Sequence, residues 1–275
     1  PLIVSNLLQV LFNVADIAVV GRFAGSSALG SVGSTTILVT MFTSFLIGVS
    51  GGINVLTALY LGSGDRKGVR ETVHSALLFS VLTGLVLLFI GAVFSKGILQ
   101  LLNTKPELID GAVLYIRIYF LGMPALAVYN FGNAVFSAAG DTKRPLKYLS
   151  MAGVVNIILN LFFVIACHMG VAGVAVSSII SQYLSAFLVA AALFRTKDIY
   201  GLKRSELRLN RSKTMNIIRI GIPAGFQNAI FQIANLFVQA GVNSFDATMV
   251  AGNAAAANAR KPMLILVRAF IIVKN

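Results

Sequence analysis

The sequence predicts an all-α fold, a polytopic bundle of membrane-spanning helices. Hydrophobic residues make up 57% of the chain, charged residues only 11%, and the mean hydropathy is +0.87. Soluble domains carry roughly 25% charged residues, so this composition favours an integral membrane protein. The net charge of +13 is spread between hydrophobic runs and forms no aromatic-laced basic patch, so we expect no nucleic-acid partner.

Eight hydrophobic runs predict about eight transmembrane helices, because a helix needs about 20 apolar residues to cross a bilayer. The runs cover residues 1–20, 28–61, 70–95, 108–139, 145–167, 170–194, 214–243 and 247–273. The second and fourth are long and contain helix breakers, Gly51-Gly52 and Pro124, so we expect both helices to bend or to extend beyond the membrane. Cys167 ends the fifth run and is expected to be a small buried hydrophobic residue.

Basic residues are concentrated in alternate loops. The loops after the second, fourth and sixth runs carry thirteen Lys and Arg residues, whereas the loops after the first, third, fifth and seventh carry three. Positive loops stay on the cytoplasmic side of a membrane. We therefore expect the N-terminus and the even-numbered loops to be cytoplasmic.

The longest and most charged loop predicts the domain boundary. We expect residues 1–194 to form a six-helix bundle, residues 195–213 a cytoplasmic linker, and residues 214–275 the first two helices of an incomplete second bundle. A repeat with a constant offset of 222 residues crosses this linker and pairs Pro1 with Pro223, Asn6 with Asn228, Asn13 with Asn235 and Gly30 with Gly252. Two six-helix halves of parallel topology would produce this pattern.

The first helix of each predicted half carries a polar stripe. Steps of three or four residues keep each stripe on one helical face, with Asn6, Gln9, Asn13 and Asp16 in the first run and Asn228, Gln232, Asn235 and Gln239 in the seventh. Such faces would line an internal cavity. The candidate substrate-cavity residues are Gln9, Asn13, Asn228, Gln232 and Asn235.

Asp16 is the single acidic residue placed deep within a predicted span. A charged carboxylate there costs at least about 2.5 to 3.5 kcal/mol on insertion scales, so it needs a partner, protonation or an aqueous cavity. The candidate partners are Asn156 and Asn160, one turn apart in the fifth run, and Ser178, beside Ser177 in the sixth. Carboxylate, amide and hydroxyl oxygens suit a small cation or a proton.

We therefore expect an ion-coupling site at Asp16, Asn156, Asn160 and Ser178, with Na⁺ as one candidate ion at the first three. Two alternatives stay open. Asp16 could be a protonated structural acid, and the two asparagines could serve as hydrogen-bonding contacts between helices.

Other chemistry is poorly supported by the sequence. The run GSGDRKG at 62–68 lacks the Gly-Lys-Ser/Thr ending of a phosphate-binding loop and is interpreted as a connector. His74 and His168 have no further ligand at metal-binding spacing. We expect no enzyme and no cofactor apart from H⁺ or Na⁺ as coupling ion.

Several stretches together resemble the multidrug and toxic compound extrusion (MATE) family. PLIVSNLLQVLFNVADIAVVGRFAGSSALGSVG looks like its first helix and following loop, AGDTKRPLKY like its loop before helix five, NIILNLFFVIACHMGVAGVAVSS like helix five and the entry to helix six, and GIPAGFQNAIFQIANLFVQAGVNSF like helix seven. The resemblance implies a twelve-helix secondary transporter of two bundles. It further implies export of small-molecule drugs, organic cations or amphipathic compounds by alternating access, coupled to inward H⁺ or Na⁺ flow, in the bilayer of a bacterial cytoplasmic (inner) membrane.

The resemblance also matches individual residues. Asp16 matches the family's helix-one acid, Gln9 a polar position of the same helix, and Asn156 the helix-five asparagine. Asn160 stands where many members carry a second acid, and Ser178 where they carry threonine. One carboxylate is therefore left instead of two, and the identity of the coupling ion does not carry over from the family.

The chain departs from the family after Ala259, where ARKPMLILVRAFIIVKN places charges in an expected helix, and helices nine to twelve are absent. We expect a fragment that holds the first bundle and the start of the second. A lipid or polysaccharide flippase of a related fold is the alternative, but its cavity should be lined by basic residues, and only Arg117 and Arg219 are candidates in the first seven runs. An intramembrane enzyme would need a second catalytic residue beside Asp16, and none is evident.

Overall fold

The computed structural model describes residues 19–102 and 104–243, and all regular structure in these ranges is helical. The elements are η1 (Val20–Ala24), α2 (Gly25–Gly62), α3 (Arg66–Leu101), α4 (Pro106–Phe120), α5 (Met123–Ala138), α6 (Lys143–Leu161), η2 (Phe162–Ala166), α7 (Gly170–Arg195), η3 (Arg204–Glu206) and α8 (Arg211–Asn243). The prediction of an all-α fold is confirmed. The first predicted helix lies almost wholly outside the described residues, and the eighth lies entirely outside them.

Four described helices are long and apolar enough to cross a membrane, namely Ser27–Gly62, Arg66–Leu101, Lys143–Ala166 and Gly170–Arg195. A fifth span is added if the bent pair α4 and α5 crosses as one unit. The predicted seventh span, which corresponds to α8, is helical but is not among them. Polar residues such as Asn228 and Gln232 lower the hydropathy of this helix. Within the described residues the structure therefore supports up to five of the eight predicted spans.

The predicted bend of the fourth span is confirmed. The helix breaks after Phe120, and α5 restarts at Met123 with a bend of 48°. Pro124 occupies the first turn of α5. A helix tolerates proline there, because the N–H groups of the first turn have no partner within the helix and the fixed φ of proline is helical. Tyr183 of α7 donates a hydrogen bond to the Leu121 carbonyl oxygen at 3.1 Å, so a backbone acceptor at the break is satisfied by a neighbouring helix.

The second span, for which a bend or an extension beyond the membrane was predicted, is a single long helix: α2 runs without a break from Gly25 to Gly62, through Gly51-Gly52. One of these glycines instead permits a close helix crossing. A Cβ at Gly52 would lie 2.6 Å from the Gly221 nitrogen of α8, whereas a Cβ at Gly51 would meet no atom within 4 Å. The crossing of α2 and α8 thus depends on a missing side chain at residue 52.

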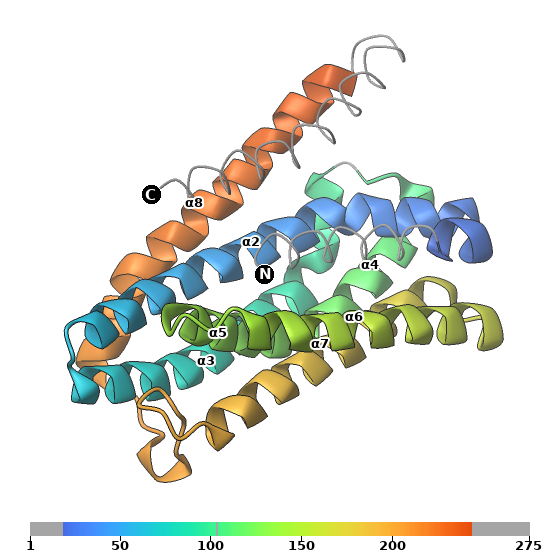
Figure 1. The fold of residues 1–275 in the computed structure, drawn as a ribbon. Coiled ribbons are helices and arrows are strands. Elements are labelled where there is room, and N and C mark those ends of the chain that lie inside the picture. Colours follow the sequence, from blue (N-terminus) through green and yellow to red (C-terminus); the bar gives the residue numbers. More distant parts are fainter. Residues whose placement is uncertain (1–18, 103, 244–275) are drawn as a thin grey trace, which may run out of the picture. The chain divides into compact units, whose positions relative to one another are not determined.

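Helices α2 to α7 run alongside one another, with α5 packed against α2, α3 and α7 (Figure 1). The core between them includes fully buried Phe131, Phe136 and Leu193 towards one end, and Ile116 and Phe120 towards the other. Large apolar side chains elsewhere point outward, as expected for helices that face lipid: Val55, Leu59, Leu82, Phe89, Phe94, Ile158 and Phe187 are all exposed.

The chain divides into two compact units, residues 1–229 and residues 230–275. The described part of the first unit contains the helical bundle, the segment 196–210 and the first half of α8. The boundary between these units falls inside α8 and not at the charged loop. The predicted division into residues 1–194, 195–213 and 214–275 stays a prediction.

Cys167 is exposed, so the prediction that it is buried is wrong. The π-helical turn η2 ends at Ala166, and Cys167 is the residue that directly follows it. His168 then adopts a positive φ of 52°, which turns the chain before α7 begins at Gly170. Cys167 therefore lies in a connection between two helices and not within a packed span.

Candidate functional site

A cleft of about 390 Å³ lies among α2, α4, α5, α6 and α7. Its polar and aromatic lining consists of Thr40, Thr43, Ser44, Tyr115, Tyr119, Tyr129, Asn130, Asn156, Ser178, Ser181, Gln182 and Ser185. None of the described lining residues is Asp, Glu, Lys or Arg. The cleft therefore offers hydroxyl groups, amides and aromatic rings, but its described wall carries no formal charge.

Three tyrosines give the cleft an aromatic wall. Tyr115 and Tyr119 stand one turn apart on α4, and their rings stack with centroids 5.8 Å apart and an interplanar angle of 20°. Tyr129 joins them from α5. Aromatic faces attract organic cations and stack on planar ring systems. This wall is chemically suited to flat or cationic organic molecules.

The α7 wall presents a row of polar side chains one turn apart. The Ser181 hydroxyl donates a hydrogen bond to the Ser177 carbonyl oxygen at 2.8 Å. The Ser185 hydroxyl donates a hydrogen bond to the Gln182 carbonyl oxygen at 2.8 Å. Their oxygen lone pairs can still accept hydrogen bonds. The spacing of Ser178, Ser181, Gln182 and Ser185 places them on one helical face. This stripe was a detectable signal in the sequence, and the sequence interpretation missed all of it except Ser178.

Two buried polar atoms in the cleft lack a hydrogen-bond partner among the described residues: Oγ1 of Thr43 on α2 and Oε1 of Gln182 on α7. Burying an unpaired polar atom costs free energy, so such atoms are the ones that a ligand can satisfy with most benefit. Sequence reasoning did not identify either residue. Thr43 and Gln182 line the same cleft because α2 and α7 lie close together in the folded chain, and this tertiary contact is not visible in the sequence.

The predicted ion-coupling residues of α6 and α7 come together. Asn160 Nδ2 donates a hydrogen bond to Asn156 Oδ1 at 3.2 Å, and both side chains are buried. Asn156 and Ser178 line the same cleft, whereas Asn160 is fully buried and is not among its lining residues. The remaining candidates of the first helix, Gln9, Asn13 and Asp16, lie outside the described residues.

The candidate cavity residues of α8 do not line this cleft. Asn228 belongs to the first compact unit and is partly exposed, and Gln232 and Asn235 belong to the second. The side chain of Asn235 lies outside the described part of the chain. Their assignment to a substrate cavity stays a prediction.

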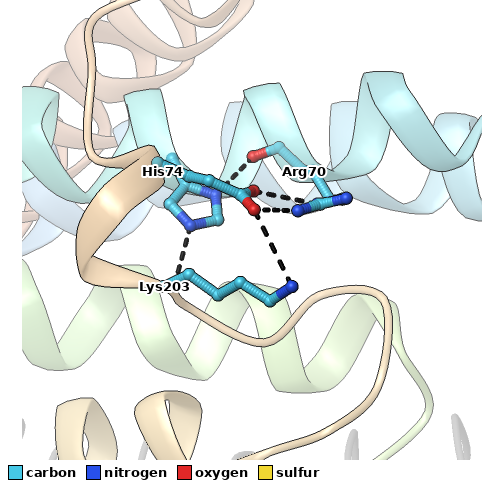
Figure 2. A network of polar contacts seen from close by, with 4 residues as sticks. Arg70, His74 and Lys203 are labelled. Carbon is cyan, nitrogen blue, oxygen red and sulfur yellow. Dashed lines mark hydrogen bonds and ion pairs between the residues drawn. The ribbon is translucent and has the colours of Figure 1, made fainter.

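A second polar cluster ties the segment 196–210 to the start of α3 (Figure 2). His74 is buried, its Nδ1 lies 2.7 Å from the Arg70 carbonyl oxygen, and its Nε2 accepts the Lys203 backbone N–H at 2.9 Å. Glu206 forms two hydrogen-bonded contacts with the Arg70 guanidinium, one of them from Nε at 2.9 Å, and lies 3.8 Å from Lys203 Nζ. His74 thus has a structural role, and the described residues hold no group of three metal-ligating side chains.

The geometry of the connector 62–68 also shows its structural role. Gly64 adopts a positive φ of 71°, and the Asp65 carboxylate accepts the Gly68 backbone N–H at 2.9 Å, capping α3. It joins α2 to α3 as a tight turn, which is the structural role predicted from the sequence.

Comparison with known families decides the broader assignment. The MatE family profile matches residues 1–162, which is more than half of the chain. The chain belongs to the MATE family. This membership confirms the predicted resemblance, and the described residues contain several helices that could span a membrane.

A curated relative agrees with this assignment, and solved structures share the fold. The chain is 32% identical over 255 residues to the probable multidrug resistance protein YpnP of Bacillus subtilis (strain 168), an alignment that covers 92% of the chain and 56% of YpnP. A MOP superfamily transporter from Pyrococcus furiosus, described as having a binding pocket of reverse polarity, matches with a TM-score of 0.85 at 22% identity, over 95% of the chain and 58% of that protein.

An inward-facing multidrug resistance MATE family transporter matches with a TM-score of 0.75 at 23% identity, over 84% of the chain and 52% of that protein. At these identities the solved structures show a shared fold alone. The chain spans about half the length of the relatives and solved structures that it matches here.

Proposed function

We propose that the chain forms the first bundle, and the start of the second, of a secondary active multidrug transporter. In this proposal the complete protein has twelve helices and exports organic cations or amphipathic drugs by alternating access, coupled to H⁺ or Na⁺ entry. Family membership and the name of YpnP support this class of function. The observation that carries the proposal is the cleft among α2, α4, α5, α6 and α7.

The chemistry of this cleft favours drug-like ligands over anionic ones. Its described wall contains tyrosine rings, amides and hydroxyl groups and has no Arg or Lys side chain. A flippase for anionic lipid-linked sugars would need cations there to neutralise the phosphate groups. Arg117 and Arg219, the two basic residues considered for such a role, are exposed and lie outside the described lining. The flippase alternative therefore has less support than drug export.

Ion coupling is assigned to Asp16, Asn156, Asn160 and Ser178. The contact between Asn156 and Asn160 and the shared position of Asn156 and Ser178 on the cleft support a cluster of oxygen ligands on α6 and α7. Asp16 would contribute the single carboxylate of this site and alternate between ion-bound and ion-free states.

The orientation follows from the charge of the loops. With thirteen basic residues after the second, fourth and sixth runs and three after the others, the N-terminus and the segment 196–210 are assigned to the cytoplasm of a bacterial inner membrane. The end of α6 and the start of α7 then lie on the opposite side.

Transport requires the second bundle, because alternating access moves two bundles around a shared cavity. The chain alone, reconstituted in lipid vesicles, is expected to show no ion-driven drug flux. Flux equal to that of a complete MATE protein would contradict the two-bundle proposal.

The decisive test uses the chain completed by a full second bundle and reconstituted in vesicles with an imposed H⁺ or Na⁺ gradient. Asp16→Asn keeps the volume of the side chain but removes its charge, so gradient-driven export of an organic cation should be lost while the protein still inserts and folds. The matched control is Asp110→Asn, which removes an exposed acid of α4. Export by Asp16→Asn at the rate of the unmodified protein would reject the coupling role.

A further inference from the structure

A second cleft, of about 710 Å³, lies where α7 ends. One wall is formed by five residues of α7 and the other by four of the following segment: Phe187, Ala190, Ala191, Phe194 and Arg195 face Leu202, Lys203, Arg204 and Ser205. It is separate from the central cleft, because the two share no lining residue.

The α7 wall is an apolar strip that leads up to a cation. Phe187 and Phe194 are two turns apart, and Ala190 and Ala191 lie between them, so the four residues lie on one face of the helix. Phe187 is 69% exposed and Phe194 38%, so no described helix covers the strip. Arg195 is the last residue of the apolar span, roughly 12 Å along the helix axis from Phe187. The strip thus runs from within the hydrophobic span to its end.

The opposite wall adds two more cations. Lys203 and Arg204 join Arg195, and no carboxylate is among the lining residues. In the part of the chain that the structure describes, Lys203 is 3.8 Å from Glu206, but no carboxylate pairs with Arg195 or Arg204. The cleft therefore combines two uncompensated guanidinium groups with an apolar strip.

Backbone contacts hold this wall in place. The Leu202 N–H donates to the Leu193 carbonyl oxygen of α7 at 3.0 Å, and the Lys203 N–H donates to His74 Nε2 (Figure 2). Leu202 is buried. Because residues 202 and 203 are both anchored, the position of Arg204 beside the end of α7 is preformed and does not depend on a ligand.

We propose that this cleft is a binding site for an anionic phospholipid. The guanidinium groups of Arg195 and Arg204 bind the phosphate, and one acyl chain lies along Phe194, Ala191 and Phe187. Basic pockets at the ends of membrane helices bind lipid head groups through this combination of charge and apolar surface. A soluble phosphate would use the cations but leave the apolar strip exposed, so the strip favours a lipid.

A neighbouring cleft of about 500 Å³ supports the same chemistry. It shares Phe187, Ala191 and Arg195 with the first and adds Arg144 and Lys197, together with the carboxylate of Asp198. Cations thus gather around the end of α7 from α6 and from the following segment. The inference goes beyond the proposed transport activity and does not depend on the coupling ion.

The test measures lipid binding to the full chain purified in detergent, by native mass spectrometry during titration with dioleoyl phosphatidylglycerol. Dioleoyl phosphatidylcholine tests the need for net negative charge, and glycerol phosphate tests the need for acyl chains. The charge variant is Arg195→Gln with Arg204→Gln. Its matched control, Lys143→Gln with Lys147→Gln, removes two exposed charges of α6 that line neither cleft.

We expect the unmodified chain to retain one phosphatidylglycerol with clear preference over phosphatidylcholine. The charge variant should bind it roughly tenfold or more weakly, because two attractive charges are lost, and the control should bind normally. Ala191→Phe, which fills the apolar strip without changing charge, should weaken binding as well. Circular dichroism and the melting temperature in detergent verify that each variant is folded.

Four outcomes would overturn the proposal: equal weakening in the Lys143 and Lys147 control, equal retention of phosphatidylcholine, competition by glycerol phosphate at the same concentration as the lipid, or normal binding by Ala191→Phe. If the double charge variant does not fold, the single Arg204→Gln variant is used to test the site. Arg204 lies outside the spans, so its substitution should not disturb the folding of a span. This single variant should show a smaller loss of binding, and an unchanged affinity would reject the site.

Discussion

Gly52 of α2 and Gly221 of α8 meet backbone to backbone. A Cβ on Gly52 would lie 2.6 Å from the Gly221 nitrogen, and a Cβ on Gly221 would lie 2.8 Å from the Val49 carbonyl oxygen. Neither distance leaves room for a methyl group. The bundle therefore holds the first half of α8 through a crossing that tolerates no side chain at either position.

Gly52→Leu should destabilise this crossing. The added side chain must push α8 away, and overpacking of this kind costs about 1 to 3 kcal/mol. The expected result is a lower melting temperature of the purified chain in detergent. Gly51→Leu is the control, because a Cβ there meets open space. Equal melting temperatures of the two variants would show that the crossing contributes nothing to stability.

His74→Phe should loosen the segment 196–210 more than Glu206→Gln does. The histidine is buried, and its loss leaves the Lys203 N–H without its acceptor, a cost of about 1 to 3 kcal/mol. The Arg70–Glu206 pair is partly exposed, so removing it should cost about 0 to 1 kcal/mol. Hydrogen exchange of the segment measures both effects. The opposite order would contradict the geometry of the cluster.

Gln182→Leu should weaken the binding of ligands that carry hydrogen-bond donors. The unpaired Oε1 of Gln182 is available to such ligands, and one hydrogen bond is worth about 0.5 to 1.5 kcal/mol. Fluorescence titration compares a donor-bearing organic cation with an analogue that lacks the donor. If the hydrogen bond matters, only the donor-bearing cation should lose affinity. Gln100→Leu, on the exposed end of α3, should change neither affinity. Equal losses for both ligands would point to a packing effect.

Asn160→Asp, in the completed transporter, should move the pH optimum of export. The substitution adds a carboxylate beside Asn156 and supplies a second titratable group to the proposed coupling site. Asn210→Asp adds a negative charge at the start of α8, outside the bundle interior, and should leave the pH profile unchanged. If both profiles coincide with that of the parent protein, Asn160 has only a packing role.

Cysteine labelling tests the proposed orientation. Cys167 is exposed and should react with a membrane-impermeant maleimide added to intact cells. In a Cys167→Ser background, Ser205→Cys should react only after the cells are opened, because its segment is assigned to the cytoplasm. Labelling of Ser205→Cys in intact cells would reverse the orientation.

Hydrophobic runs predicted most helix positions well, because lipid-facing surfaces require continuous apolar stretches. The run 170–194 corresponds to α7, Gly170–Arg195, and the run 145–167 to Lys143–Ala166. For α3 the run 70–95 was too short at both ends. Its first turn is charged, and the capping contact from Asp65, which extends the helix beyond the apolar run, does not register in hydropathy.

The candidate site was predictable only where it follows from spacing along one helix. Asn156 and Asn160, one turn apart, do form a hydrogen bond. Thr43 and Gln182 were missed because they share a cleft only through the packing of α2 with α7, which one sequence does not specify. The close crossing at Gly52 was not predicted for the same reason: a glycine pair in a sequence indicates a bend and a close crossing equally well.

The two residues in the break between α4 and α5 both contact α7. Tyr183 supplies the donor for the Leu121 carbonyl oxygen, and a side chain on Gly122 would collide with Gln182 Oε1. Replacing Tyr183 with Phe would leave a carbonyl without that partner, and a larger residue at 122 would demand a smaller one at 182. In an alignment of close homologues that keep the bend, the residues at 122 and 182 should therefore change together, whereas position 183 should keep a hydroxyl donor whatever residue stands at 121, because the donor contacts only the backbone there.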